Sequence, residues 1–222
     1  MRFRYFINEA NQRGLGLTAF DIDDTLFHTF ALIKVIKDGE ITKELSNQEF
    51  NVYTLKPGET FDFSQFREAD FFDETSKPIK KMLDKARAII KNAKEKGSKV
   101  ILLTARKDFD DKEIFLNTFR KYNFPIDDVY VERAGNKSGS VIADIKKDII
   151  VNYLRTGLYR RVRLFDDDIK NCTTFVNIKN DIPEHILRAV RDKYGLEDIS
   201  DDEIIKFEAF LVDKNGSTRS IK

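Results

Sequence analysis

Asp21 and Asp23 are the two residues of this chain that are best placed for chemistry. They follow an apolar run at residues 17–20 that has the length and character of a buried strand. Open α/β sheets bind ligands at the carboxyl ends of their strands, and burying unpaired carboxylates is costly unless a metal ion or a substrate uses them. A strand that simply ends in a polar loop, with Asp24 forming a turn, would explain the same residues without chemistry.

A second acidic cluster follows another apolar run. Residues 161–165 lead into Asp166, Asp167 and Asp168, and Asn171 comes four residues after Asp167. Adjacent like charges repel one another unless they share a cation. Carboxylate oxygens and water are the ligands that Mg²⁺ prefers. The cluster therefore predicts a magnesium site at the end of this second strand.

Candidate phosphate contacts lie between these two clusters. Thr104, Ala105 and Arg106 end a third apolar run, at residues 99–103, and a hydroxyl near the start of a helix is a natural phosphate ligand. Threonine is also a common helix cap, so Thr104 alone is a weak signal. Lys146 follows in a helical segment and would neutralise a phosphate, although a lysine whose stem lies along the core would look the same in sequence.

The elements that must position these residues alternate along the chain. Strand-like runs occur at residues 17–22, 99–103, 128–131, 161–165 and 207–212, and helical periodicity covers residues 78–96, 110–122 and 140–154. Strands that alternate with helices indicate right-handed βαβ units. We therefore expect an α/β fold with a central, mainly parallel, five-stranded sheet flanked by helices. Asn215 and Gly216 predict a late turn, followed by a short terminal strand or a frayed end.

Residues 28–77 interrupt this alternation. Residues 31–37 and 41–45, joined by the turn dipeptide Asp38-Gly39, predict a β-hairpin, and an aromatic-rich stretch follows. The insert would form either a small satellite core or a flap or cap that closes over the carboxylates. Both interpretations remain open, since a cap must also pack.

Composition is consistent with a single domain of 222 residues. The formal net charge is +1, so no bulk charge favours nucleic acid or a membrane as partner. A single cysteine, Cys172, permits no intrachain disulfide and fits a reducing compartment. We found no apolar run long enough for a membrane span and no secretory signal, so we expect a cytoplasmic protein without a membrane partner. The sequence does not indicate an oligomeric state.

These segments together resemble the haloacid dehalogenase (HAD) superfamily of phosphohydrolases, over residues 17–212. The order and spacing of the four HAD motifs agree with this chain. The matching residues are Asp21 and Asp23 in the first motif, Thr104 in the second, Lys146 in the third, with Lys147 as the competing choice, and Asp166, Asp167 and Asn171 in the fourth. The resemblance implies a HAD-like Rossmannoid domain in which residues 28–77 form a flap or small cap.

The resemblance also implies a mechanism. Asp21 would attack phosphorus to form an aspartyl-phosphate, and Asp23 would act as general acid and then general base. Thr104 and Lys146 would stabilise the phosphoryl oxygens. Mg²⁺ would be held by Asp21, the Asp23 backbone carbonyl and Asp166, with Asp167 as an orienting residue or a ligand through water.

These motifs do not identify the substrate. The layout is similar to the 3′-phosphatase domain of polynucleotide kinase-phosphatases, which also carry an arginine after the second motif, as Arg106 does here. This chain has Asp24 where that family usually has glycine, and it has no P-loop. A small phosphorylated metabolite or nucleotide and a nucleic-acid 3′ end are therefore both candidate substrates. Arg160, Arg161 and Arg163 would either line a polynucleotide path or decorate a strand margin.

The first ten residues carry a second resemblance. They look like the short capsid-targeting peptides of tailed-bacteriophage internal head proteins, with a cleavage point after Glu9. An ordinary first helix is the alternative. A phage origin would place the protein in the host cytoplasm or the virion interior, and a non-catalytic HAD scaffold packaged in the phage head is then a further possibility. The intact motif residues, from Asp21 to Asp166, favour retained chemistry.

Overall fold

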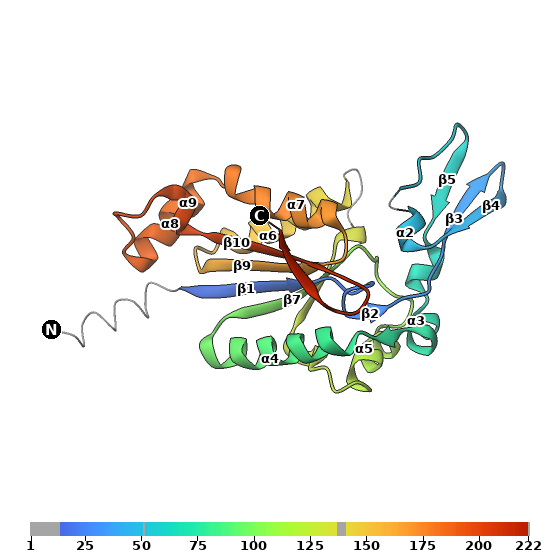
Figure 1. The fold of residues 1–222 in the computed structure, drawn as a ribbon, viewed down its shortest axis with the longest axis horizontal. Coiled ribbons are helices and arrows are strands. Elements are labelled where there is room, and N and C mark those ends of the chain that lie inside the picture. The colour runs from blue at the N-terminus through green and yellow to red at the C-terminus, as the bar shows by residue number, and fades with distance from the viewer. Residues whose placement is uncertain (1–13, 51, 137–140, 222) are drawn as a thin grey trace.

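The computed structural model describes residues 14–50, 52–136 and 141–221, so the predicted N-terminal peptide lies outside the described residues. At the centre is a six-stranded sheet in the order β11-β10-β9-β1-β7-β8, in which β11 alone runs antiparallel to its neighbour (Figure 1). Its strands are β1 (Leu15–Phe20), β7 (Lys99–Thr104), β8 (Tyr130–Arg133), β9 (Tyr159–Asp166), β10 (Lys206–Val212) and β11 (Thr218–Ile221).

The α/β class and the mainly parallel sheet are confirmed, but the expected number of five strands is wrong. The five predicted runs correspond to β1, β7, β8, β9 and β10, and β11 adds a sixth strand after the turn that contains Gly216. The Asp213 carboxylate accepts hydrogen bonds from the backbone N–H groups of Asn215 and Ser217, which fixes this turn. Of the two alternatives that the sequence left open after this turn, a short terminal strand and a frayed end, the structure shows the strand, which pairs with β10.

Helices cover both faces of the sheet. In Figure 1, α4 and α5 lie below the sheet, and α6 and α7 lie above it. Each face buries its own apolar core, one packed by α4 and α5 and the other by α6, α7 and α8. The helices of the main body are α4 (Lys80–Lys96), α5 (Lys112–Arg120), α6 (Ile142–Leu154), α7 (Ile169–Asn177), α8 (Glu184–Tyr194) and α9 (Asp201–Ile204), with short 3₁₀ turns η2 (Ile126–Asp128), η3 (Ala134–Asn136) and η4 (Ile178–Asn180).

The predicted hairpin is present in the insert. It joins β3 (Ile33–Lys37) to β4 (Glu40–Leu45), and its central residues Asp38 and Gly39 have φ values of 53° and 85°, as a tight hairpin turn requires. The aromatic-rich stretch is more regular than the sequence suggests. It contains α2 (Asn47–Phe50), β5 (Glu59–Asp62), η1 (Ser64–Arg67) and α3 (Ala69–Thr75), while β2 (Phe27–His28) pairs with β6 (Lys77–Pro78) where the insert leaves and rejoins the body.

The insert has a core of its own, which agrees with both interpretations of this segment, because a cap must pack as a satellite core does. Its three strands, in the order β4-β3-β5, project from the end of the main sheet at which β1 and β7 terminate (Figure 1). The buried residues of this core are Ala31, Ile33, Val35, Leu45 and Phe66. Aromatic rings extend the core, with Phe50 and Phe61 at a centroid distance of 5.0 Å.

No helix of the described residues has both the length and the apolar character needed to cross a membrane.

Candidate active site

The loop after β1 brings Asp21 and Asp23 to the same side of the chain. The N–H of Asp21 still donates to the carbonyl of Phe165 at 2.9 Å, so the parallel ladder with β9 extends to this residue. Ile22, between the two aspartates, is fully buried in the core. Because successive side chains of an extended segment alternate in direction, burying Ile22 turns both carboxylates away from that core.

Lys146 joins the two acidic clusters that the sequence predicted. Its Nζ lies 2.8 Å from Oδ1 of Asp21 and 2.7 Å from Oδ2 of Asp166, although Asp21 is 125 residues away in the chain. The lysine lies on α6 among buried residues of that helix, such as Ile145 and Ile149, and is itself only 4% exposed. Lys147 instead forms an exposed ion pair with Asp181. The structure therefore brings Lys146, and not Lys147, to the carboxylates.

Asp166 is the most tightly held residue of the site. It is fully buried at the end of β9, and Oδ1 accepts hydrogen bonds from the Asp168 N–H at 2.9 Å and from Asn171 Nδ2 at 2.9 Å. Asn171 also contacts Oδ2, the oxygen that accepts from Lys146. Asn171, which the sequence placed with the acidic cluster, thus orients Asp166 from the first turns of α7.

The carboxyl groups of the site are buried, and they outnumber the one lysine that neutralises them. Burial, reinforced by the neighbouring Asp166, raises the pKa of Asp21 to about 8, and the same causes raise the pKa of Asp167 to about 9. Burial alone would lower the pKa of Lys146, but Asp166 and Asp21 outweigh it and raise that pKa. One ammonium therefore faces three carboxyl groups, and burial favours the protonated form of Asp21 and Asp167.

Thr104 is the last residue of β7, and Ala105 follows it at the same end of the sheet. Thr104 is fully buried, and its Oγ1 accepts a hydrogen bond from the Arg106 N–H at 3.1 Å, as expected for a hydroxyl that caps the turn after a strand. Ala105 is exposed. Gly135 lies against this turn so closely that a Cβ atom there would come within 2.1 Å of the Ala105 carbonyl oxygen. The turn after β7 is thus held by the neighbouring strand β8 and its η3 turn.

Arg106 faces Asp23. Its Nε lies 3.1 and 2.9 Å from the two carboxylate oxygens of Asp23, and Nη2 lies 2.6 Å from Oδ1. The third nitrogen, Nη1, donates to the Phe66 carbonyl of the insert at 2.8 Å. The sequence expected Arg106 to contact phosphate, whereas in this structure all three guanidinium nitrogens have protein acceptors.

The insert also reaches the loop after β1. Asn47 of α2 donates through Nδ2 to Oδ2 of Asp24 at 3.3 Å, and His28 Nδ1 lies 3.5 Å from Oδ1 of the same aspartate. Asp24 has a φ of 51°, in the left-handed region that glycine adopts most easily. Aspartate tolerates this conformation better than most residues, so Asp24 can occupy the position without glycine.

The donor atoms present fit a hard divalent cation. In the described part of the chain, no group of three or more carboxylate, imidazole or thiol side chains is already spaced to hold a metal ion. Asp21, Asp166 and Asp167 nevertheless supply buried and half-buried carboxylate oxygens around a single lysine. Such oxygen donors with uncompensated negative charge are the chemistry that Mg²⁺ sites use.

Comparison with known proteins adds no family assignment, because neither a protein-family model nor a curated protein matches this chain. The arrangement of side chains must therefore carry the functional argument. Sequence reasoning named Asp21, Asp23, Thr104, Lys146 and Asp166 together, and the structure brings them to one end of the sheet. Sequence reasoning did not identify Phe66, Asn47 or Gly135. Phe66 contacts the site through its backbone carbonyl, Asn47 through a side-chain hydrogen bond to a distant residue, and Gly135 through a close approach, and none of these leaves a pattern in the sequence.

Proposed function

We propose that this chain is a Mg²⁺-dependent phosphomonoester hydrolase of the HAD type, acting on a small phosphorylated metabolite or nucleotide. The observation that best supports the proposal is the lysine of α6, Lys146, whose ammonium bridges Asp21 and Asp166 from two adjacent strands. A nucleophile, a second acid, a hydroxyl and a cation at the carboxyl ends of parallel strands form the set that phosphoryl transfer requires.

In this proposal Asp21 attacks phosphorus and forms an aspartyl-phosphate while the ester oxygen leaves. Asp23 donates a proton to that oxygen and then accepts a proton from the water that hydrolyses the intermediate. Thr104 and Lys146 stabilise the phosphoryl oxygens. Asp21, the Asp23 carbonyl and Asp166 would hold Mg²⁺, with Asp167 beside them. When bound, the cation neutralises phosphate charge and favours ionised Asp21.

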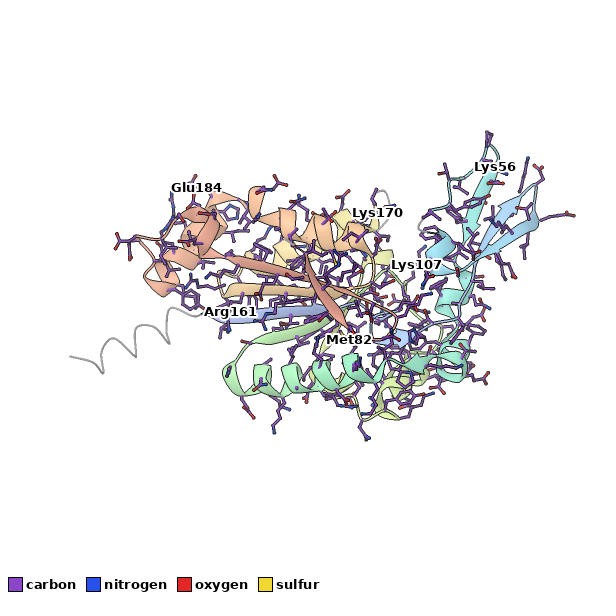
Figure 2. The ribbon with its side chains drawn as sticks, viewed as in Figure 1. Lys56, Met82, Lys107, Arg161, Lys170 and Glu184 are labelled. Carbon is purple, nitrogen blue, oxygen red and sulfur yellow. The ribbon has the colours of Figure 1, made fainter. Side chains whose placement is uncertain are left out.

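A small substrate agrees best with where the basic side chains lie. Arg160 and Arg161 are at the start of β9, at the opposite end of that strand from Asp166, which is about 20 Å from Arg160 and about 17 Å from Arg161 at 3.3 Å per residue. Arg163 pairs with Glu208 on the neighbouring strand at 2.8 Å. Figure 2 shows Arg161 far along the sheet from Lys107, which follows β7. These arginines therefore do not support a polynucleotide path to the site.

The test is Mg²⁺-dependent release of phosphate from a panel of esters. The panel contains nucleoside 5′- and 3′-monophosphates, a sugar phosphate, an aryl phosphate and a 3′-phosphorylated oligonucleotide. Asp21→Asn should abolish turnover because an amide is a poor nucleophile, whereas Asp38→Asn, the same change in the exposed hairpin turn, should leave it intact.

The best member of the panel decides the substrate class. A preference for the oligonucleotide over every mononucleotide would replace the small-substrate proposal by a 3′-end phosphatase. Turnover that survives in Asp21→Asn would contradict the covalent mechanism. A folded protein that hydrolyses no member, with or without Mg²⁺, would favour a non-catalytic role for the scaffold.

A further inference from the structure

The guanidinium of Arg106 is enclosed as completely as a core side chain. Its side chain is 1% exposed, and its central carbon lies 4.8 Å from the ring centroids of both Phe66 and Phe72 and 5.2 Å from that of Phe109. Aromatic rings favour a cation over their faces. A buried charge needs a partner of opposite sign, and the only carboxylate paired with Arg106 among the described residues is Asp23.

This enclosure leaves the guanidinium little room to serve a ligand. Nε and Nη2 both point to Asp23, and Nη1 donates to the Phe66 carbonyl. The planar fork of arginine fixes both the distance and the plane of a carboxylate that it grips with two nitrogens. Asp23 lies in the loop after β1, just before the turn at residues 24–26. Among the described residues, only Arg106 donates hydrogen bonds to its carboxylate, so without this grip the side chain would be free to change rotamer.

We propose that Arg106 is a positioning residue that aims the carboxyl group of Asp23 at the reacting oxygen and does not bind the phosphate. Because Phe66 belongs to η1 of the insert, the insert shares in holding this arginine. The inference deepens the proposed function and rests on it, since Asp23 has an acid–base task only in that reaction. It differs from the sequence-based expectation that Arg106 contacts substrate.

The experiment compares two phosphate esters with different leaving groups. An alkyl phosphate needs a proton on its leaving oxygen, whereas a dinitrophenyl phosphate does not, so only the first depends on a well-placed Asp23. Arg106→Gln should lower kcat for the alkyl ester about 100-fold and for the dinitrophenyl ester less than about 5-fold, with KM little changed. Arg106→Lys, which keeps the charge but loses the fork, should show the same pattern.

Arg133→Gln is the matched control. Arg133 is also largely buried, stacks on Phe109 and Phe115 at 5.5 and 4.9 Å and pairs with Asp108 at 2.9 Å. No contact joins it to Asp23. Its replacement should therefore slow both esters equally, if at all, and it reports what the loss of a buried, ring-stacked arginine does by itself.

A double-mutant cycle with Asp23→Asn gives a second readout. If Arg106 acts through Asp23, Arg106→Gln should have almost no further effect on alkyl ester hydrolysis once Asp23 is replaced. Additive losses, or a raised KM with equal slowing of both esters, would show instead that Arg106 binds phosphate directly and would overturn the proposal.

Two outcomes separate this inference from the proposed function. If the wild-type protein hydrolyses neither ester, the proposed phosphatase function is refuted, and the positioning role of Arg106 is refuted too. If wild type is active but Arg106→Gln does not fold, thermal unfolding will show this, and Arg106→Lys carries the comparison. A crystal structure of Arg106→Lys in which Asp23 keeps its wild-type position, together with unchanged leaving-group dependence, would overturn the inference alone.

Discussion

Lys146 Nζ lies 2.8 Å from Oδ1 of Asp21, and both side chains are almost completely buried. A buried lysine is costly to desolvate and is retained where its charge is needed. Here the ammonium of Lys146 neutralises two carboxylates from adjacent strands, Asp21 after β1 and Asp166 at the end of β9. The same ammonium would neutralise a phosphoryl group bound at Asp21, so one side chain serves both the fold and the proposed chemistry.

Replacing Lys146 with alanine should therefore damage stability and turnover together. The change leaves Asp21 and Asp166 buried without their cation, which we expect to lower the free energy of unfolding by about 3 kcal/mol. Lys147→Ala is the control, because its pair with Asp181 is partly exposed and should cost less than about 1 kcal/mol. Urea unfolding and phosphate release measure the two effects. Equal losses in both variants would contradict the assignment of Lys146.

The pKa of Asp167, raised to about 9 chiefly by burial and then by Asp166, predicts a specific pH dependence of stability. Between the ordinary value of 3.8 and about 9, the folded protein keeps a proton that the unfolded chain releases. The free energy of unfolding should thus fall as pH rises through that window, and the loss should be complete above it. Asp167→Asn cannot ionise and should be more stable than wild type at pH 8.5.

Urea unfolding in EDTA at pH 4 and pH 8.5 measures this effect. The advantage of Asp167→Asn should be near zero at pH 4 and reach about 1 kcal/mol or more at pH 8.5, which is about 2–4 °C in Tm for a chain of this size. Asp148→Asn, at an exposed position of α6, is the control and should show no such trend. An advantage that is independent of pH would rule out titration of Asp167 as its source.

Mg²⁺ should stabilise the protein more strongly at pH 8 than at pH 6. Protons on Asp21 and Asp167, whose pKa values are raised to about 8 and about 9 by burial and like charge, compete with the cation for the same oxygens. Differential scanning fluorimetry with Mg²⁺ and then EDTA measures the rise in Tm and its reversal. Asp166→Asn should lose most of the rise. A rise of equal size in that variant and at both pH values would place Mg²⁺ elsewhere.

Gly135→Ala should disturb the site from a distance. A Cβ atom at this position would lie 2.1 Å from the Ala105 carbonyl oxygen and 2.8 Å from the carbonyl carbon of Arg106, and a backbone so close cannot move aside cheaply. We expect a loss of about 1–3 kcal/mol in the free energy of unfolding and a lower kcat, because Arg106 shifts with its turn. Gly16→Ala, whose nearest neighbour would be Ser98 Oγ at 3.5 Å, is the matched control. Similar losses in both variants would show that the turn after β7 is not special.

The sequence by itself determined the α/β class and the end of the sheet at which polar residues gather. Short runs such as residues 161–165, which alternate with helical segments, are typical of strands in an α/β sheet, and acids that follow such strands lie at the carboxyl edge. The hairpin turn at Asp38-Gly39 was equally predictable, because few residues adopt a positive φ at low cost. These features are local, so periodicity and turn chemistry suffice to predict them.

The tertiary structure decided which partners those residues take. Lys146 and Lys147 are neighbours with the same side chain, and only the packing of α6 shows that the first is buried on Asp21 while the second faces Asp181. From the sequence, Arg106 is likewise predicted to be a phosphate ligand. Only the structure shows that it is enclosed by the insert and paired with Asp23. Pairings of this kind join residues far apart in the chain. They depend on burial and direction in three dimensions, which a one-dimensional pattern does not contain.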